Sequence, residues 1–266
     1  MNKMRLLFTL ILAVMFILPA FSAVANNDLD ARKIAIDDGA RGKPVKPPPT
    51  PEPTPGDGVV RKWALLIGIS DYEGTSSDLT YADDDAKDWN NKLKPLGYSI
   101  TMLLDSQATK TNILNAFQNL ANNEDGDDIV FIAYSGHGYY AKSARQSGLV
   151  AHELVLVYEN EIEAITDTFE SQAVFFFDDA CNQGTMVNLA NAGWVAAIGS
   201  QTNTYTYDGD ASMANGIFTY YAIHEGMDVY HYTTAEEIGN YAVQEFTANT
   251  PGRATLIDNY SGSLTL

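Results

Sequence analysis

From residue 61 onward, short apolar runs alternate with segments whose apolar residues recur at helical spacing. The apolar runs predict buried strands, and the helical spacing predicts amphipathic helices, the second of which has Thr109 or Thr111 as its N-cap. The strands are expected at 63–69, 99–104, 129–134, 173–177, 194–198 and 254–257, with 149–158 extended, and the helices at 82–96, 109–123, 159–169, 216–224 and 234–247. Strands that alternate with helices indicate an α/β fold with a mostly parallel central sheet and helices on both faces.

The first 25 residues have the pattern of a secretory signal peptide. Lys3 and Arg5 precede an apolar run over 6–20, and the small residues at 23–25 suit a signal peptidase. A retained membrane anchor is the alternative, but the run is short for a span of about 20 residues. We therefore expect residues 1–25 to be removed, the mature chain to begin near Asn26 without a stable membrane span, and the protein to be secreted or extracytoplasmic.

Residues 26–60 have the composition of a linker. Seven of the 10 prolines of the chain lie between Pro44 and Pro55, in a stretch rich in Pro, Thr and Glu that favours extended backbone. The remaining residues, 61–266, are enough for one hydrophobic core and few for two. The sequence thus predicts a signal peptide over 1–25, a Pro-rich disordered linker over 26–60 and one folded domain over 61–266.

The charge and the cysteine content narrow the possible functions. The formal net charge is −18, and loss of Lys3 and Arg5 with the signal peptide makes the mature chain more negative still. Such an acidic protein is a poor ligand for nucleic acid, whose phosphates attract cations. The chain has a single cysteine, Cys181, so no intramolecular disulfide is possible. In a secreted protein a lone cysteine is either a free reactive thiol or a buried bystander.

Two polar motifs follow two of the predicted strands. Ser135-Gly136-His137-Gly138 comes after the strand at 129–134, and Asp178-Asp179-Ala180-Cys181 comes after the strand at 173–177. The carboxyl ends of parallel strands meet at one edge of an open sheet, so this order brings a thiol and an imidazole together. An imidazole beside a thiol helps it to ionise and later returns a proton to the leaving group. The sequence therefore predicts a catalytic pair of Cys181 and His137.

These motifs resemble the caspase-like cysteine peptidases, most closely their metacaspase branch. The stretches 65–72, 79–86 and 213–221 are similar to the opening strand, the first helix and a late helix of that family, so the resemblance covers about residues 61–258. It implies a single caspase-like domain that acts as a cysteine endopeptidase. Cys181 would be the nucleophile and His137 the acid and base. The backbone amides of Gly138 and Cys181 would stabilise the oxyanion.

The resemblance also implies a substrate preference. Animal caspases carry a glutamine just before Ala-Cys for substrates with aspartate, whereas this chain has Asp179 there, which would repel an acidic side chain. In metacaspases two aspartates line the pocket, and by position they correspond to Asp179 and Asp85, with Ser135 beside them. The expected substrates are peptides or proteins with Arg or Lys at the cleaved position. The alternative for Asp85 is a charge that favours the start of its helix.

The residue that orients His137 is not evident in the sequence. Asp178 is a weak candidate, and a polar strand end is the simpler interpretation of this residue. The resemblance implies that a backbone carbonyl takes this role. Metacaspases often bind calcium through aspartates in the loop after the histidine, but the loop at 139–148 contains Lys142 and Arg145 and no acidic residue. Zinc-peptidase and EF-hand spacings do not occur either, so we expect no cofactor.

Two other functions stay open at this point. One is a catalytically silent family member that binds peptides or tethers to another surface protein through its long N-terminal linker. The other is a relative that transfers acyl groups and so ligates peptides instead of hydrolysing them. A peptidase that prefers basic residues would also find cleavage sites in its own linker region. The candidate sites for this self-processing are Arg41, Lys43, Lys46, Arg61 and Lys62.

Overall fold

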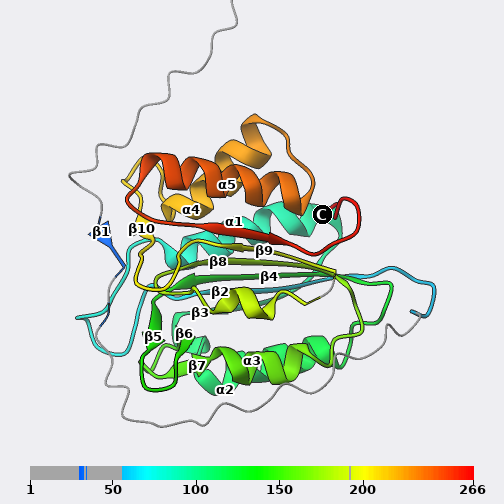
Figure 1. Cartoon of the computed structure of the whole chain (residues 1–266), viewed down its shortest axis with the longest axis horizontal. Coiled ribbons are helices and arrows are strands. Elements are labelled where there is room, and N and C mark those ends of the chain that lie inside the picture. Colours follow the sequence, from blue (N-terminus) through cyan, green and yellow to red (C-terminus); the bar gives the residue numbers. More distant parts are fainter. Residues whose placement is uncertain (1–29, 33, 35–55, 192) are drawn as a thin grey trace, which may run out of the picture.

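The computed structural model describes residues 30–32, 34, 56–191 and 193–266. The predicted signal peptide and most of the predicted linker lie outside these residues. A six-stranded sheet in the order β11-β9-β8-β4-β2-β3 forms the centre (Figure 1). Adjacent strands of this sheet run parallel to each other, except that β11 runs antiparallel to β9. The strands are β2 (Lys62–Gly68), β3 (Ser99–Leu104), β4 (Ile129–Gly136), β8 (Ala173–Ala180), β9 (Trp194–Ile198) and β11 (Thr255–Asp258).

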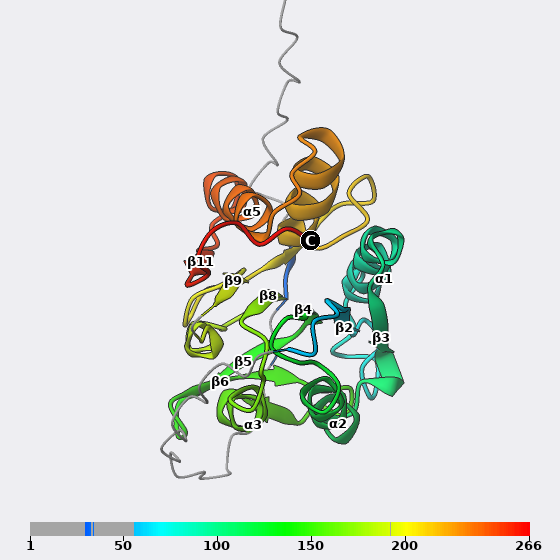
Figure 2. The same cartoon turned by 90° about the vertical axis from the view of Figure 1, so that its right-hand side faces the viewer.

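Helices cover both faces of this sheet, as the alternating pattern predicts. In the view of Figure 2, α1, α5 and the segment of α4 lie on one side and α2 and α3 on the other. The helices are α1 (Ala82–Leu93), α2 (Lys110–Ala121), α3 (Glu159–Thr166), α4 (Ile217–Tyr220), which continues as a π-helix (Tyr221–Val229), and α5 (Ala235–Asn249), with 3₁₀ turns at Lys94–Leu96, Asp105–Gln107 and Met186–Leu189. Within the described residues, none of these helices has the length and apolar character needed to cross a membrane.

Alternation along the strands divides the core into two layers. Leu65 and Ile67 of β2 pack on the α2 and α3 side, whereas Ala64 and Leu66 pack on the α1 and α5 side, and all four are fully buried. Successive side chains of a strand point to opposite faces, so a central strand covered on both faces is apolar throughout. The same rule sends neighbouring polar residues at the strand ends to opposite faces of the sheet.

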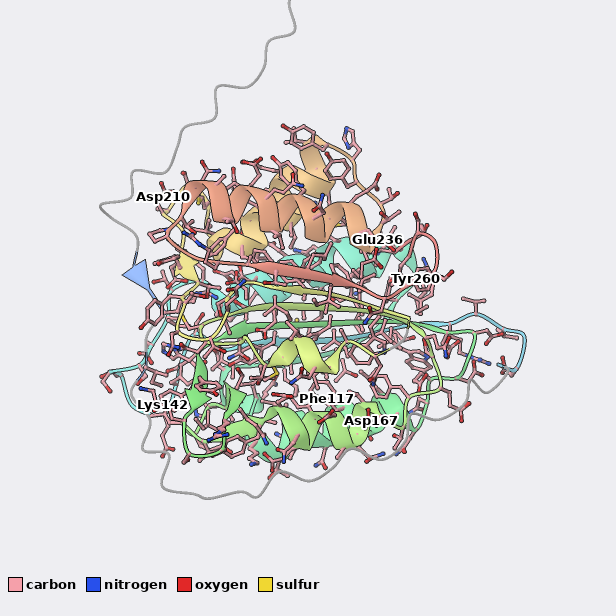
Figure 3. All side chains as sticks on the ribbon, viewed as in Figure 1. Phe117, Lys142, Asp167, Asp210, Glu236 and Tyr260 are labelled. Carbon is pink, nitrogen blue, oxygen red and sulfur yellow. The ribbon has the colours of Figure 1, made fainter. Side chains whose placement is uncertain are left out.

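A second, smaller sheet lies beside the carboxyl ends of the central strands. It consists of the antiparallel strands β5 (Gly138–Ala141), β6 (Gln146–Val150) and β7 (Leu156–Tyr158). The segment 149–158, predicted as one extended run, is therefore two strands with a turn between them. Lys142, in the hairpin between β5 and β6, is exposed and lies at the same side of the molecule as Asp210 in Figure 3.

Most predicted elements are present, with ends displaced by a few residues. Thr109 is the N-cap of α2, and its hydroxyl accepts a hydrogen bond from the amide of Asn112 at 3.3 Å. The prediction of a linker over 26–60 does not hold for residues 30–32. There β1 (Asp30–Ala31) pairs antiparallel with β10 (Tyr207–Asp208), and the side chain of Arg32 is buried in the domain.

Candidate active site

The two motifs lie side by side because β4 and β8 are parallel neighbours in matching register. Ser135 pairs with Asp179 and Gly136 with Ala180, so His137 and Cys181 each follow directly where their strand ends. Asn182 has a φ of 60°, a left-handed conformation that asparagine tolerates and that turns the chain sharply after Cys181. The carboxyl ends of β4 and β8 therefore bring together the thiol and the imidazole that the sequence predicts.

Backbone and tyrosine contacts fix the position of His137. Both ring nitrogens face carbonyl oxygens, Nε2 that of Ser77 at 2.8 Å and Nδ1 that of Arg32 at 3.4 Å, and the shorter contact assigns the proton of the neutral ring to Nε2. The His137 amide donates to the Tyr72 hydroxyl at 2.7 Å, and the Tyr134 hydroxyl donates to the His137 carbonyl at 2.7 Å. Burial lowers the pKa of His137 below its usual value, which favours the neutral imidazole that a general base requires.

Cys181 is completely buried because the N-terminal segment covers it. Its thiol donates to the backbone carbonyl oxygen of Arg32 at 2.7 Å, and His137 Nδ1 lies 3.4 Å from the same oxygen. Burial raises the pKa of the Cys181 thiol to about 12. The thiol and the imidazole therefore face one carbonyl group, and both are neutral while the segment stays in place.

Gly138 allows the two strand ends to approach closely. A Cβ atom at this position would stand 2.1 Å from the Cys181 carbonyl oxygen and 2.0 Å from Gln183 Nε2, so no larger residue fits. The backbone of Gly138 consequently lies directly beside that of Cys181. This close approach of the two backbones is what a glycine beside His137 predicts.

An acidic pocket lies beside Cys181 and holds the side chain of Arg32. Asp85 Oδ2 is 3.3 Å from Arg32 Nη2, and Asp179 Oδ1 is 3.5 Å from Arg32 Nη1. The hydroxyl of Ser135 accepts from Nη1 at 2.9 Å and donates to Asp85. The structure thus brings Asp85, Asp179 and Ser135 together around the guanidinium of Arg32. Asp85 turns inward and is fully buried, so its role is not limited to the start of helix α1.

A third carboxylate, which the sequence analysis did not identify, completes this pocket. Asp208 Oδ1 accepts a hydrogen bond from Arg32 Nε at 2.9 Å and forms an ion pair with Arg32 Nη2 at 2.8 Å. Asp208 belongs to β10, a strand of two residues without an apolar run. Nothing in the local sequence predicts the contacts that His137 makes with Tyr72, Ser77 and Tyr134.

Neighbouring groups hold the remaining positions of the pocket. Asp179 Oδ2 accepts from the amide of Thr219 at 3.1 Å and from its hydroxyl at 2.9 Å. Asp85 Oδ1 accepts from the amide of Gly216 at 2.9 Å and from Asn215 Nδ2 at 3.0 Å. These donors pre-organise the two carboxylates, so a cation that enters the pocket finds oxygens already in position.

The electrostatics of the pocket favour a bound cation. Burial raises the pKa of Asp85 to about 7, and burial likewise raises the pKa of Asp179. Burial disfavours the charge of Arg32, but attraction by Asp208, Asp179 and Asp85 outweighs it and raises the Arg32 pKa above its usual value. Two buried acidic groups, Asp85 and Asp179, and the partly buried Asp208 surround one guanidinium and leave a negative pocket, which would repel a carboxylate.

Asp178 does not belong to this pocket. It is fully buried on the opposite face of β8 from Asp179, and neither of its carboxyl oxygens has a hydrogen-bond partner among the described residues. Burial, with the charge of Asp179 nearby, raises its pKa well above the usual value and keeps it neutral. The carbonyl of Ser77, and not Asp178, is the group that contacts the far nitrogen of His137.

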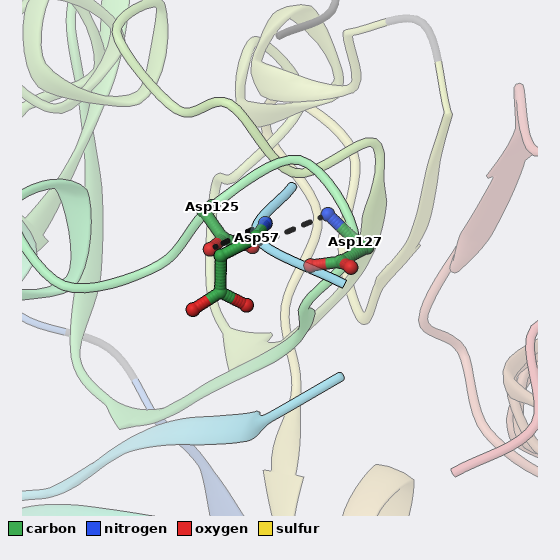
Figure 4. Close-up of side chains that lie close together, drawn as sticks. All are labelled: Asp57, Asp125 and Asp127. Atoms are coloured by element: carbon green, nitrogen blue, oxygen red, sulfur yellow. Dashed lines mark hydrogen bonds between the residues drawn. The ribbon is translucent and has the colours of Figure 1, made fainter. Parts of the chain in front are cut away.

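Three other carboxylates approach one another near the amino end of β4, at the opposite end of the strands from Cys181 (Figure 4). Asp57, Asp125 and Asp127 each have an oxygen within 4.8 Å of the others, and all are at least partly exposed. Asp125 and Asp127 precede the first residue of β4, whereas Cys181 follows the last residue of β8. Their oxygens also accept hydrogen bonds from the amides of Asp57 and Gly58. This cluster is separate from the site around Cys181.

Comparison with known proteins gives metacaspases as relatives. Metacaspase-6 of Arabidopsis thaliana is 26% identical over 174 residues, which are 58% of this chain and 45% of the relative. Metacaspase-1 of Candida albicans is 40% identical over 87 residues, which are 29% of this chain and 19% of the relative. The matched part is thus less than half the length of each of these two metacaspases.

A solved structure supports the fold. Protein GSU0716 of Geobacter sulfurreducens superposes with a TM-score of 0.62 and 17% sequence identity, over 77% of this chain and 97% of that protein. The family model of the caspase domain matches residues 61–256, which include both strand-end motifs and the three pocket carboxylates. The chain therefore belongs to the caspase-domain family.

Proposed function

We propose that the protein is a cysteine endopeptidase that hydrolyses peptide bonds after Arg or Lys. The observation that carries this proposal is the position of one arginine: the guanidinium of Arg32 lies among three carboxylates while its carbonyl oxygen lies 2.7 Å from Cys181 Sγ. A peptide that binds with its cleaved residue in this pocket would present its scissile carbonyl to the thiol. The metacaspases among the relatives support a peptidase of this type.

The chemistry follows from the two side chains. His137 Nδ1 takes the thiol proton, and the Cys181 sulfur attacks the carbonyl carbon to form a tetrahedral intermediate. The amides of Gly138 and Cys181 would donate to its oxyanion. The C–N bond then breaks, and the new amine leaves with the proton from His137. Water hydrolyses the thioester, which restores the thiol and releases the carboxylate product.

The pocket accounts for the proposed preference. A guanidinium presents five donors in a planar fork, so it can contact Asp85, Asp179 and Asp208 together, as Arg32 does. The ammonium of lysine is a single charged point on a stem of similar length and would satisfy fewer of these oxygens. We therefore expect Arg to be cleaved faster than Lys. Acidic residues at the cleaved position should be excluded by repulsion.

A panel of fluorogenic peptides that differ only at the cleaved residue tests the proposal. We expect cleavage after Arg and Lys, slow cleavage after Leu, and none after Asp. The Cys181→Ala variant, produced in the same way, is the control and should cleave none of them. Faster cleavage after Asp than after Arg would contradict the proposed specificity, and equal activity of the Cys181→Ala variant would contradict the proposed nucleophile.

We also propose that the enzyme acts outside the cytoplasm after removal of residues 1–25. The support is the basic start, the apolar run over 6–20 and the small residues at 23–25. N-terminal sequencing of Cys181→Ala protein exported by a cell tests this part independently of self-cleavage. A first residue near Asn26 is expected, and a chain that keeps Met1 and stays with the cells would contradict it.

A further inference from the structure

The backbone of residues 30–32 lies in the site as a bound peptide would. Asp30 and Ala31 pair antiparallel with Asp208 and Tyr207, and the amide of Arg32 donates to the Thr206 carbonyl at 3.3 Å. Adding a strand to a sheet edge is a common way in which proteins hold an extended peptide, because it satisfies the peptide's backbone groups. The chain thus supplies its own peptide to the strand that borders the pocket.

The carbonyl of Arg32 lies against the thiol and the imidazole. Cys181 Sγ lies 2.7 Å from its oxygen and His137 Nδ1 lies 3.4 Å from it. A buried arginine could be held by acidic groups merely to stabilise a fold. Such a structural ion pair would not require the following peptide bond to meet the nucleophile and its base, and this coincidence needs a functional explanation.

The side chain of Arg32 occupies the acidic pocket. Arg32 is 1% exposed and contacts Asp85, Asp179 and Asp208, while its Nη1 donates to the Asp179 carbonyl at 3.0 Å. A substrate arginine needs the same oxygens, so it cannot enter while Arg32 is bound. The segment therefore excludes other substrates.

We propose that the peptide bond between Arg32 and Lys33 is the chain's own cleavage site, and that residues 30–32 block the site until that bond is cut. This inference rests on the proposed function. It also changes the self-processing hypothesis drawn from the sequence, which considered basic residues further along the chain. Of those, Arg61 donates its amide to Asp128 at 2.6 Å and Lys62 begins β2, so both are tied into the fold. Arg41, Lys43 and Lys46 lie outside the described residues.

The reaction is one turnover of the proposed mechanism on the chain itself. Cys181 sulfur bonds to the Arg32 carbonyl carbon, and the bond to the Lys33 nitrogen breaks, with the Lys33 amine taking the proton that His137 received from the thiol. Water then hydrolyses the thioester and leaves a carboxylate on Arg32. The short peptide that ends in Arg32 is no longer tethered to the domain, so it dissociates and opens the pocket.

Incubation of the purified full chain, followed by N-terminal sequencing and intact-mass measurement, tests this inference. Wild type should acquire a new terminus at Lys33, and Cys181→Ala should stay uncut. Arg32→Ala should not be cut at this bond, whereas the matched control Arg41→Ala should be cut as wild type is. Because the segment is already seated in its own pocket, the rate constant should not change with protein concentration.

A second readout follows the block itself. Uncut wild type should hydrolyse an Arg peptide with a lag that ends as the Lys33 terminus accumulates, and Arg32→Ala should begin without a lag. Arg-peptide hydrolysis without any Lys33 terminus would overturn the inference and leave the proposed function standing. Self-cleavage at Arg41, Lys43 or Lys46 alone, or a rate proportional to protein concentration, would also overturn it. If wild type stayed uncut and the opened Arg32→Ala variant also hydrolysed no Arg peptide, both proposals would fail.

Discussion

Replacing Asp179 with asparagine should remove the preference for arginine while leaving the site otherwise intact. The substitution keeps the shape of the side chain, and its amide oxygen can still accept from the Thr219 hydroxyl, which donates to Asp179 Oδ2 at 2.9 Å. What is lost is a buried charge whose Oδ1 lies 3.5 Å from the guanidinium of Arg32. We take this arginine as the guide to how a substrate arginine binds.

The magnitude follows from the burial of the pair. Both side chains are fully buried, so solvent screens their attraction little. A hydrogen bond or close contact to a charged group is worth about 1.5 to 3 kcal/mol, and Asp85 and Asp208 stay in place to hold the cation. A loss near 3 kcal/mol corresponds to about a hundredfold decrease in kcat/KM for arginine peptides, since about 1.4 kcal/mol is a factor of ten.

The assay is kcat/KM for otherwise identical Arg, Lys and Leu peptides, measured on protein whose N-terminal segment has been removed. The matched control is Asp178→Asn. Asp178 is equally buried, adjacent in sequence and already neutral, but it faces away from the pocket. We expect the control to keep the wild-type ratio of Arg to Leu cleavage. If Asp179→Asn lowered kcat/KM for all three peptides by the same factor, or left the ratio of Arg to Leu cleavage unchanged, the assignment of Asp179 to substrate recognition would be wrong.

Three further predictions concern the nucleophile, the pH dependence and the pocket wall. Cys181→Ala should abolish cleavage and shift the thermal midpoint by only a few degrees, because the removed group is small; wild-type turnover would refute the assignment. The ratio of Arg to Leu cleavage should rise as pH increases through 7, since burial raises the pKa of Asp85 to about 7 and only the ionised form attracts a cation. Asp85→Asn should flatten this profile, and an unchanged pH step in that variant would contradict it. Gly216→Ala should lower arginine cleavage about tenfold or more, measured as kcat/KM, since the added Cβ would stand 2.6 Å from Arg32 Nη2 and 2.4 Å from Asp179 Oδ2.

The sequence predicts the central sheet well because its signal is local. Apolar runs such as 129–134 and 173–177 are long enough to indicate buried strands, and their order along the chain places His137 and Cys181 at one edge. The pocket roles of Asp85 and Asp179 came from the resemblance to metacaspases, since an aspartate at a strand end or a helix start has ordinary structural explanations as well.

The rest of the site depends on contacts between segments that are far apart in sequence. Asp208 lies 176 residues from Arg32, and its strand of two residues carries no periodic pattern. Arg32 itself precedes the Pro-rich stretch that begins at Pro44, in the region 26–60 whose composition indicates a linker. Arg32 is buried because the folded domain offers the edge of β10 to its backbone and three carboxylates to its guanidinium, and neither is evident in the local sequence.

The most direct test of the central claim is covalent labelling of the opened site with a peptidyl chloromethyl ketone. Such a reagent forms a thioether only where a reactive cysteine and a fitting side-chain pocket coincide. In the Arg32→Ala chain, the arginyl reagent should modify Cys181, located by peptide mass mapping, and abolish peptide hydrolysis, whereas the aspartyl reagent should leave Cys181 unmodified. Preferential labelling of Cys181 by the aspartyl reagent, or hydrolysis that persists after Cys181 is fully alkylated, would contradict an Arg-directed cysteine peptidase.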